Sequence, residues 1–161
     1  MAAVDYFLKI DGIDGESLDA KHKGEIDVAS WSWGESRTGS LATGAGGGAG
    51  KVQMQDFHFS ARTSKASPKL MLACATGEHI KKAVLTCRKA GGDQQVEFLK
   101  YTMSDCLISS YQIAGQQSDI PEDSPSLNFA KIEIEFRAQN PDGTLAAPVN
   151  AAFDFRTNKA V

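Results

Sequence analysis

A group of glycines precedes a lysine in this chain, an arrangement that holds phosphate in many nucleotide-binding proteins. Residues 38–50 read TGSLATGAGGGAG, and Lys51 follows directly. A phosphate-binding loop also requires a glycine five residues before Gly50, and a serine or threonine after the lysine to hold magnesium. The sequence has Ala45 and Val52 at these two positions. The segment therefore lacks both features of that loop.

A looser glycine pattern, typical of dinucleotide-binding proteins, also occurs here at Gly44, Gly46 and Ala49. In those folds the glycines open a helix whose N-terminus faces the pyrophosphate. Residues 52–61 instead alternate between apolar and polar side chains with the period of a strand. We expect no nucleotide site, and a glycine-rich loop of this length is typical of a functional or mobile segment.

Nucleophile and metal motifs are absent from the sequence. The three histidines, His22, His58 and His79, are spread over a loop, a strand and the turn after a helix, and no metal-ligand spacing links them. Cys74 and His79 are the one conceivable thiolate pair, but Cys74 falls on the apolar face of a predicted helix, where burial raises a thiol pKa. We expect no catalytic residue, no metal and no cofactor.

Two carboxylates at Glu133 and Glu135 share a strand face, as a glycosidase pair would. They lie between Lys131 and Arg137, which indicates a solvated ladder of alternating charge. An all-β domain without convergent catalytic groups favours a binding or structural protein over an enzyme.

The composition limits which classes of binding partner are expected. The chain has 161 residues, 17 Lys and Arg against 20 Asp and Glu, and a formal charge of -3. This length is typical of one globular domain, here 1–161. No dense basic stripe is available to neutralise phosphates, so nucleic acid is not an expected partner.

The N-terminal residues, the apolar runs and the cysteines indicate the cellular compartment in which the protein is made. The N-terminal residues lack a basic leader and an unbroken apolar core, and the longest apolar run, 70–75, is too short to cross a membrane. Cys74, Cys87 and Cys106 are odd in number and widely spaced, and we expect them to be buried apolar residues. These features predict synthesis in the cytoplasm without a signal peptide and no direct membrane insertion.

Period-two alternation predicts a mostly β fold of about eight strands. Residues 129–137 alternate most clearly, and the turn at 90–93 predicts a hairpin followed by a separate strand at 106–113. Segments 26–33 and 52–61 change phase part-way, which indicates either β-bulges or a second face covered by a neighbouring chain.

A single short helix is predicted near the middle of the chain. Ser67 suits the N-cap, Pro68 the first helical position and Gly77 the residue past the end. Leu70, Met71 and Cys74 then share the face that packs on the sheet.

Six sequence blocks occur in the order seen in one known family. They are EIDVASWSWGES, the glycine loop running into GKVQMQDFHF, SPKLMLACATGEH, LTCRKAGGDQQVEFL, LNFAKIEIEF and FDFRTN. Together they resemble the Hcp (haemolysin-coregulated protein) tube proteins of bacterial type VI secretion systems, over almost the whole chain.

The resemblance implies a single-domain β-barrel with one flanking helix, similar to a phage tail-tube protein. It also implies that six copies close into a ring, that rings stack into a tube, and that sheath contraction expels the tube from the cell. Implied partners are further copies of the chain, small effector proteins held in the ring lumen, and the spike and sheath proteins. The family is not known for catalysis.

Within this framework the residues receive expected roles. If Trp31 and Trp33 face the core, together with Phe57 and Phe59 as further core anchors, alternation places Ser30 and Ser32 on the opposite face, as candidate lumen and cargo contacts. A candidate inter-subunit or inter-ring loop contains Thr38, Ser40, Leu41, Thr43, Gly46, Gly48 and Lys51. Ordering such a loop costs about 1–2 kcal/mol per residue, so we expect it to set only on assembly.

Two alternatives remain at the level of sequence. A stand-alone ligand-binding β-barrel, for example a lectin-like module, would run as a monomer or dimer. A hydrolase would need Cys74 or His79 for its activity.

Overall fold

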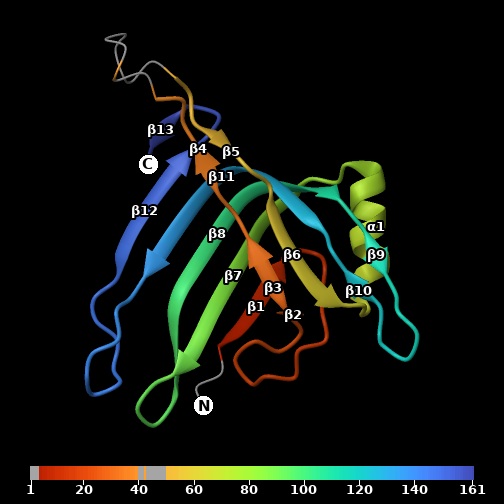
Figure 1. Ribbon diagram of the computed structural model, residues 1–161, viewed down its shortest axis with the longest axis horizontal. Helices are drawn as coiled ribbons and strands as arrows, with labels where there is room; N and C mark the ends of the chain where they lie inside the picture. The colour runs from red at the N-terminus through yellow and green to blue at the C-terminus, as the bar shows by residue number, and fades with distance from the viewer. Residues whose placement is uncertain (1–3, 40–41, 43–49) are drawn as a thin grey trace.

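The long strands of this protein lie side by side in one curved sheet, with the helix at one edge (Figure 1). The computed structural model describes residues 4–39, 42 and 50–161. Its elements, in chain order, are β1 (Asp5–Ile10), β2 (Ile26–Val28), β3 (Ser30–Ser32), β4 (Glu35–Ser36), β5 (Gln53–Met54), β6 (Phe57–Arg62), α1 (Ala66–Thr76), β7 (Ile80–Ala90), β8 (Gln95–Ser110), β9 (Ile113–Ala114), β10 (Glu122–Asp123), β11 (Ser126–Phe136), β12 (Val149–Asp154) and β13 (Lys159–Ala160).

The main sheet has the order β2-β1-β7-β8-β11-β6-β10-β9, with β3 paired to β6, and β12 and β13 continuing from β11. Every pairing is antiparallel. The prediction of a mostly β protein with one helix is confirmed for the described residues. The expected barrel is corrected in one respect, because the sheet is not closed by a continuous ladder.

The face change predicted in segment 26–33 has a structural cause. In β2, which pairs with β1, Ile26 and Val28 are buried. The N–H of the next residue, Ala29, donates to the Ser60 carbonyl of β6 (2.8 Å). From Ser30 onward the chain pairs with β6 as β3. The side chain of Trp31 then packs on the core. The chain thus changes face where it changes neighbour. A similar break separates β5 from β6. Such breaks explain why the described residues form thirteen strands, several of them only two or three residues long, rather than about eight.

Two other strand predictions need correction. Residues 106–110 are not a separate strand but the end of β8, which continues through Asp105 in a left-handed conformation (φ 55°). On β11 the expected simple alternation fails, because Phe129 and Ile132 are both buried while Phe136 is 44% exposed. The hairpin at 90–93 is confirmed, with β7 ending at Ala90 and β8 beginning at Gln95.

The helix forms as predicted, but its start and its buried face differ. The N-cap residue is Lys65, and Ser67 lies inside the first turn. There Ser67 Oγ accepts from Ser64 N–H (3.0 Å), while Ser64 Oγ accepts from Ala66 N–H (3.2 Å), so two serines share the capping. Gly77 ends the helix with φ 67°, as expected.

The core-facing side of α1 is formed by Ala66, Ser67, Leu70 and Ala73. Met71, predicted to lie on this face, is 50% exposed, and its neighbour Leu72 is 57% exposed. Cys74 is half-buried and packs against the core, which is completed by apolar side chains from β1, β2, β6, β7, β8 and β11. The helix therefore leaves an apolar strip on its outer side.

Candidate functional site

One face of β3 and β6 carries polar side chains. Ser30 and Ser32 are exposed on β3, opposite Ser60 and His58 of β6 in the strand register. Ser30 Oγ lies 2.6 Å from Ser60 Oγ. Since paired residues point to the same side of a sheet, these four side chains lie on one face, where Ser30, Ser32 and His58 are exposed and Ser60 is buried. We call this face the serine surface.

Hydrogen bonds extend the serine surface across β11 to β8. Ser126 pairs with His58 in register, and its hydroxyl contacts those of Ser109 (2.7 Å) and Ser110 (2.5 Å). Asp56 accepts hydrogen bonds from Ser109 Oγ (2.7 Å) and Asn128 Nδ2 (2.8 Å). Ser126 is itself only 1% exposed, so its hydroxyl fixes the more exposed Ser109 and Ser110 from within the protein and is not part of the solvent surface. A shallow cavity of about 240 Å³ opens on the serine surface beside Ser30, Ser32 and Ser124.

Aromatic side chains hold β3 from the other face. Trp31 is half-buried and stacks on Phe57 (ring centroids 5.9 Å apart), and its edge meets Tyr101 (5.2 Å). Trp33 is also half-buried against the core, whereas Phe57 and Phe59 are buried completely or nearly so. The structure thus places Ser30 and Ser32 opposite the two tryptophans, on a strand anchored by rigid rings.

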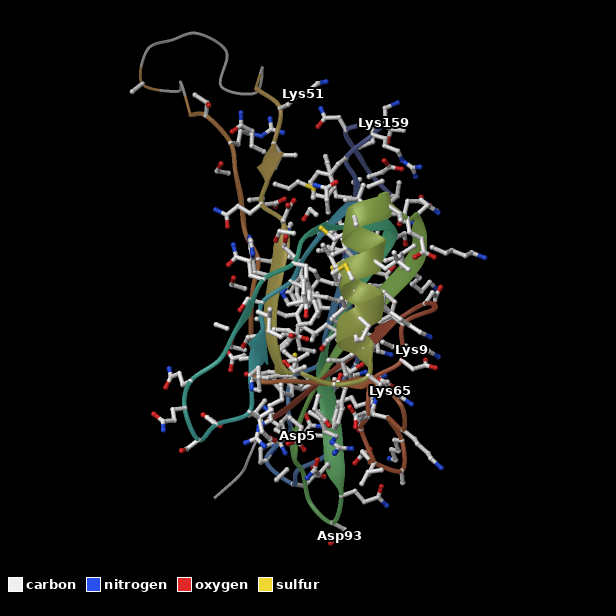
Figure 2. The ribbon with its side chains drawn as sticks, turned by 90° about the vertical axis from the view of Figure 1, so that its right-hand side faces the viewer. Asp5, Lys9, Lys51, Lys65, Asp93 and Lys159 are labelled. Carbon is white, nitrogen blue, oxygen red and sulfur yellow. The ribbon has the colours of Figure 1, made fainter. Side chains whose placement is uncertain are left out.

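The described residues that flank the candidate assembly loop lie at one end of the molecule. β4 and β5 form a separate two-stranded ribbon that leads into this loop and away from it (Figure 1). Thr38 and Lys51 are both exposed, and Figure 2 shows Lys51 at the end of the molecule opposite Asp93. Ser40, Leu41, Thr43, Gly46 and Gly48 lie outside the described residues.

The candidate catalytic residues do not converge. Cys74 is half-buried on α1, whereas His79 is exposed and its Nε2 lies 3.2 Å from Asp105. Burial raises the pKa of both Cys87 and Cys106 to about 12.

Over residues 4–39, 42 and 50–161, no group of three His, Cys, Asp or Glu side chains is placed to hold a metal ion. Within the same residues, no helix has the length and apolar character needed to cross a membrane.

An ion-pair network that no sequence motif predicts fixes the 11–25 loop on the sheet. The guanidinium of Arg88, a residue only 9% exposed, donates to Asp19 (2.7 and 2.9 Å) and Asp5 (3.2 Å). Buried His22 stacks on Phe7, with its ring nitrogens 3.0 Å from Glu25 and 2.8 Å from Glu97. The partners are up to 83 positions apart, so no local sequence pattern reveals them.

The network predicts a pH-dependent contribution to stability. Hydrogen bonding from Arg88 lowers the pKa of Asp19 from its ordinary 3.8 to about 2. Because the folded pKa lies below the unfolded one, ionised Asp19 stabilises the fold above about pH 4, and this contribution is lost as the pH falls through 4 toward 2. Asp19→Asn is therefore expected to lower the thermal midpoint at pH 7 and to converge on the parent protein near pH 2. Thermal unfolding by circular dichroism measures this.

Asp93→Asn, in the exposed β7–β8 turn, is the matched control and should follow the parent curve. A constant difference between Asp19→Asn and the parent from pH 7 to pH 2 would show that the Asp19 charge does not contribute.

Comparisons with known proteins agree with this architecture. The family model described as "Type VI secretion system effector, Hcp" matches residues 7–136. Protein hcp1 of Pseudomonas aeruginosa is 44% identical over 158 residues, covering 97% of this chain and 98% of the relative. The crystal structure of Hcp1 from Salmonella typhimurium is 35% identical, with a TM-score of 0.81 and 99% of both chains covered. A structure titled as a type six secretion system protein is 28% identical, with a TM-score of 0.92 and coverage of 99% and 100%. The chain therefore belongs to the Hcp family of type VI secretion proteins.

Proposed function

We propose that this protein is the structural subunit of a type VI secretion inner tube, acting as a single domain over residues 1–161. Six copies close into a ring, rings stack into a tube, and contraction of the sheath expels the tube. The observation that carries the proposal is the 44% identity to Pseudomonas aeruginosa hcp1 along 97% of the chain. The family is a secretion tube and effector family, so we assign a structural rather than an enzymatic role.

The distribution of exposed apolar side chains supports ring formation. A closed ring of identical chains joins two different surfaces of each copy. Met71 and Leu72 are exposed on α1, while Phe136 and Val149, paired across β11 and β12, are 44% and 71% exposed. In the view of Figure 1, α1 lies at the right of the molecule and β12 at the left. These two apolar patches have the placement that a head-to-tail contact requires.

Ring stacking needs a third contact, along the tube axis, which propagates because it does not close. We assign it to the ribbon β4–β5 and the loop that it carries, from Thr38 to Lys51. The ribbon is not hydrogen-bonded into the main sheet and lies at one end of the molecule (Figure 1). Ordering of the loop against the next ring then occurs only when assembly provides contacts.

Electron microscopy of the purified protein tests the assembly. The proposal expects six-fold rings. Monomers or dimers would contradict it and would favour the lectin-like ligand-binding barrel, an alternative for which the family membership gives no support.

The serine surface is proposed as the lumen lining that contacts small effector proteins. Small hydroxyl side chains leave the channel open and present both donors and acceptors to different cargoes. In this role the protein is made in the cytoplasm, holds cargo in the ring, meets the spike and sheath proteins, and leaves the cell through the machine that it builds.

Ser32→Gln is expected to reduce the amount of effector retained by the ring by about tenfold, because a longer amide side chain displaces cargo from a close-packed surface. Co-purification of a type VI effector with the rings measures retention, and electron microscopy confirms that the rings persist. Thr102→Gln, on β8, is the control. Full retention by Ser32→Gln rings would remove Ser32 from the cargo surface without affecting the tube assignment.

A further inference from the structure

His22 is a buried histidine whose two ring nitrogens both face carboxylate oxygens. The residue is only 6% exposed; its Nδ1 lies 3.0 Å from Glu25 Oε2, and its Nε2 lies 2.8 Å from Glu97 Oε1. The ring also stacks on that of Phe7, with centroids 4.4 Å apart and an interplanar angle of 7°. The imidazole is therefore held in one orientation, with a carboxylate at each nitrogen.

These two contacts require a proton on each ring nitrogen. A neutral imidazole has one N–H donor, and its other nitrogen can only accept a hydrogen bond. An ionised carboxylate can also only accept, so a neutral His22 would donate to one glutamate and turn a lone pair toward the other. Because histidine is ordinarily a stronger base than glutamate, the second bridging proton belongs to the ring. The geometry is that of an imidazolium between two carboxylates.

The charged groups around His22 belong to its own loop, to β1, to β7 and to β8. They are Asp19, Lys21, Glu25, Asp5, Arg88, Glu97 and Lys100. Asp5 and Asp19 share the Arg88 guanidinium, at 3.2 and 2.7 Å. Among the described residues, no lysine lies within ion-pair distance of Glu25 or Glu97. The structure thus gives both glutamates the same cationic partner, His22.

The contact between His22 and Glu97 fastens the 11–25 loop to the sheet. The backbone hydrogen bonds of residues 15–25 join the loop to itself. Side chains make the outward connections: Asp19 to Arg88 of β7, His22 to Glu97 of β8, and Glu16 to the backbone N–H of Lys65. Of these three connections, only the one through His22 contains a group whose charge ordinarily changes between pH 5 and 8.

We propose that His22 is a proton-dependent latch, which holds the 11–25 loop on β8 while the imidazole carries both ring protons and loosens when it loses one. The neighbouring anchor stays ionised over the same range. Hydrogen bonding from Arg88 lowers the pKa of Asp19 to about 2, and the bond to Asp19 raises the pKa of Arg88 above its ordinary value. Because both glutamate contacts are complete only in the protonated form, the latch is strongest at low pH and weakens as the pH rises. The latch goes beyond the tube function and does not depend on it.

Hydrogen exchange of the purified protein, followed by mass spectrometry, tests the latch. We expect the protection of residues 17–25 to fall about tenfold between pH 6 and pH 8.5, after correction for the intrinsic pH dependence of exchange. This is the size expected for losing one charge-assisted hydrogen bond. The β7–β8 ladder serves as the internal reference and should keep its protection. Unchanged protection of the loop over this range would overturn the proposal.

Glu97→Gln separates a proton-dependent contact from a merely structural one. A glutamine amide can accept from a protonated Nε2 and can donate to a neutral one, so this variant should keep the loop protected at pH 8.5. The Glu97 side chain is 37% exposed, so the change leaves the core intact. If the Glu97→Gln loop lost protection at both pH values, or followed the parent curve, the latch would be overturned.

His79→Gln is the matched control, because His79 is exposed and its ring contacts a single carboxylate, that of Asp105 (3.2 Å). It should retain the pH dependence of the parent loop. Loss of that dependence in His79→Gln would assign the effect to His79 and overturn the role of His22.

Electron microscopy at pH 6 and pH 8.5 is scored separately. The same assembly at both pH values, with the change in exchange confined to the loop, supports the latch. A change of assembly in which the β7–β8 ladder loses protection together with the loop would overturn it. Absence of six-fold rings at both pH values would contradict the tube assignment alone, so the two failures are distinct.

Discussion

Phe57→Ala is expected to lower the free energy of unfolding by about 3–5 kcal/mol, the range typical of removing a fully buried aromatic ring. The Phe57 side chain is completely buried, and its ring lies against those of Trp31 (5.9 Å) and Phe59 (6.2 Å). Removing the ring loses buried apolar area and leaves a cavity beneath β3. Urea denaturation followed by tryptophan fluorescence measures the loss, and Trp31 reports directly on the altered site.

The matched control is Phe136→Ala, the same chemical change at a ring that is 44% exposed on the edge of β11. It should cost about 1 kcal/mol, since only about half of its area leaves water on folding and no enclosed cavity is left. Equal losses in the two variants would mean that Phe57 is not a core anchor. Because β3 rests on this ring, Phe57→Ala is also expected to disturb the serine surface and to weaken cargo retention.

Asp123→Ala is expected to cost about 3 kcal/mol, because it removes the acceptor of three hydroxyl groups, one buried and two half-buried. The Asp123 carboxylate on β10 is only 2% exposed. It accepts from Ser67 Oγ of α1, Thr63 Oγ1 (3.1 Å) and Tyr111 OH (3.0 Å). One side chain thereby joins β10 to α1, to the linker before α1 and to the segment after β8. Equilibrium unfolding in urea measures the effect.

Two further variants separate the network from a local effect. Glu122→Ala, the exposed neighbour on β10, should change stability by less than about 0.5 kcal/mol. Tyr111→Phe removes one of the hydroxyl groups and should cost about 1 kcal/mol. Burial, together with the hydrogen bond to Asp123, raises the pKa of Tyr111, so its hydroxyl stays protonated and donates at neutral pH. If Asp123→Ala were no more destabilising than Glu122→Ala, the Asp123 carboxylate would not be what holds these three segments together.

Local patterns predict the features that depend on nearby residues. The helix end at Gly77 and the hairpin after Ala90 follow from turn chemistry over a few residues, and both are confirmed. The predicted start of the helix is wrong, because Ser64 Oγ accepts from Ala66 N–H while Ser67 Oγ accepts from Ser64 N–H, and either serine fits the local preference. Met71 fits the predicted buried face only because it is apolar, whereas the side chains that meet the sheet are those of Leu70 and Ala73.

Part of the serine surface can be predicted from the sequence. Alternation around Trp31 is sufficient to place Ser30 and Ser32 together on the other face of β3. The partners of these serines do not follow from the sequence, because strand order brings the buried Ser60 of β6 and Ser126 of β11 to the inner side of this face. A period of two says which residues of one strand share a face, but not which strand comes next to it.

The sequence by itself determined the family, the mostly β composition, the single helix and the change of face along 26–33. All of these depend on residue types in order along the chain. The tertiary structure decided that the sheet stays open, that Arg88 pairs with Asp5 and Asp19, and that Lys21, Lys100 and Arg137 line one cavity. These contacts join residues far apart in the chain, and no local preference encodes them. The pairing of Arg88 is set by strand order and by its burial, because a buried charge requires a partner.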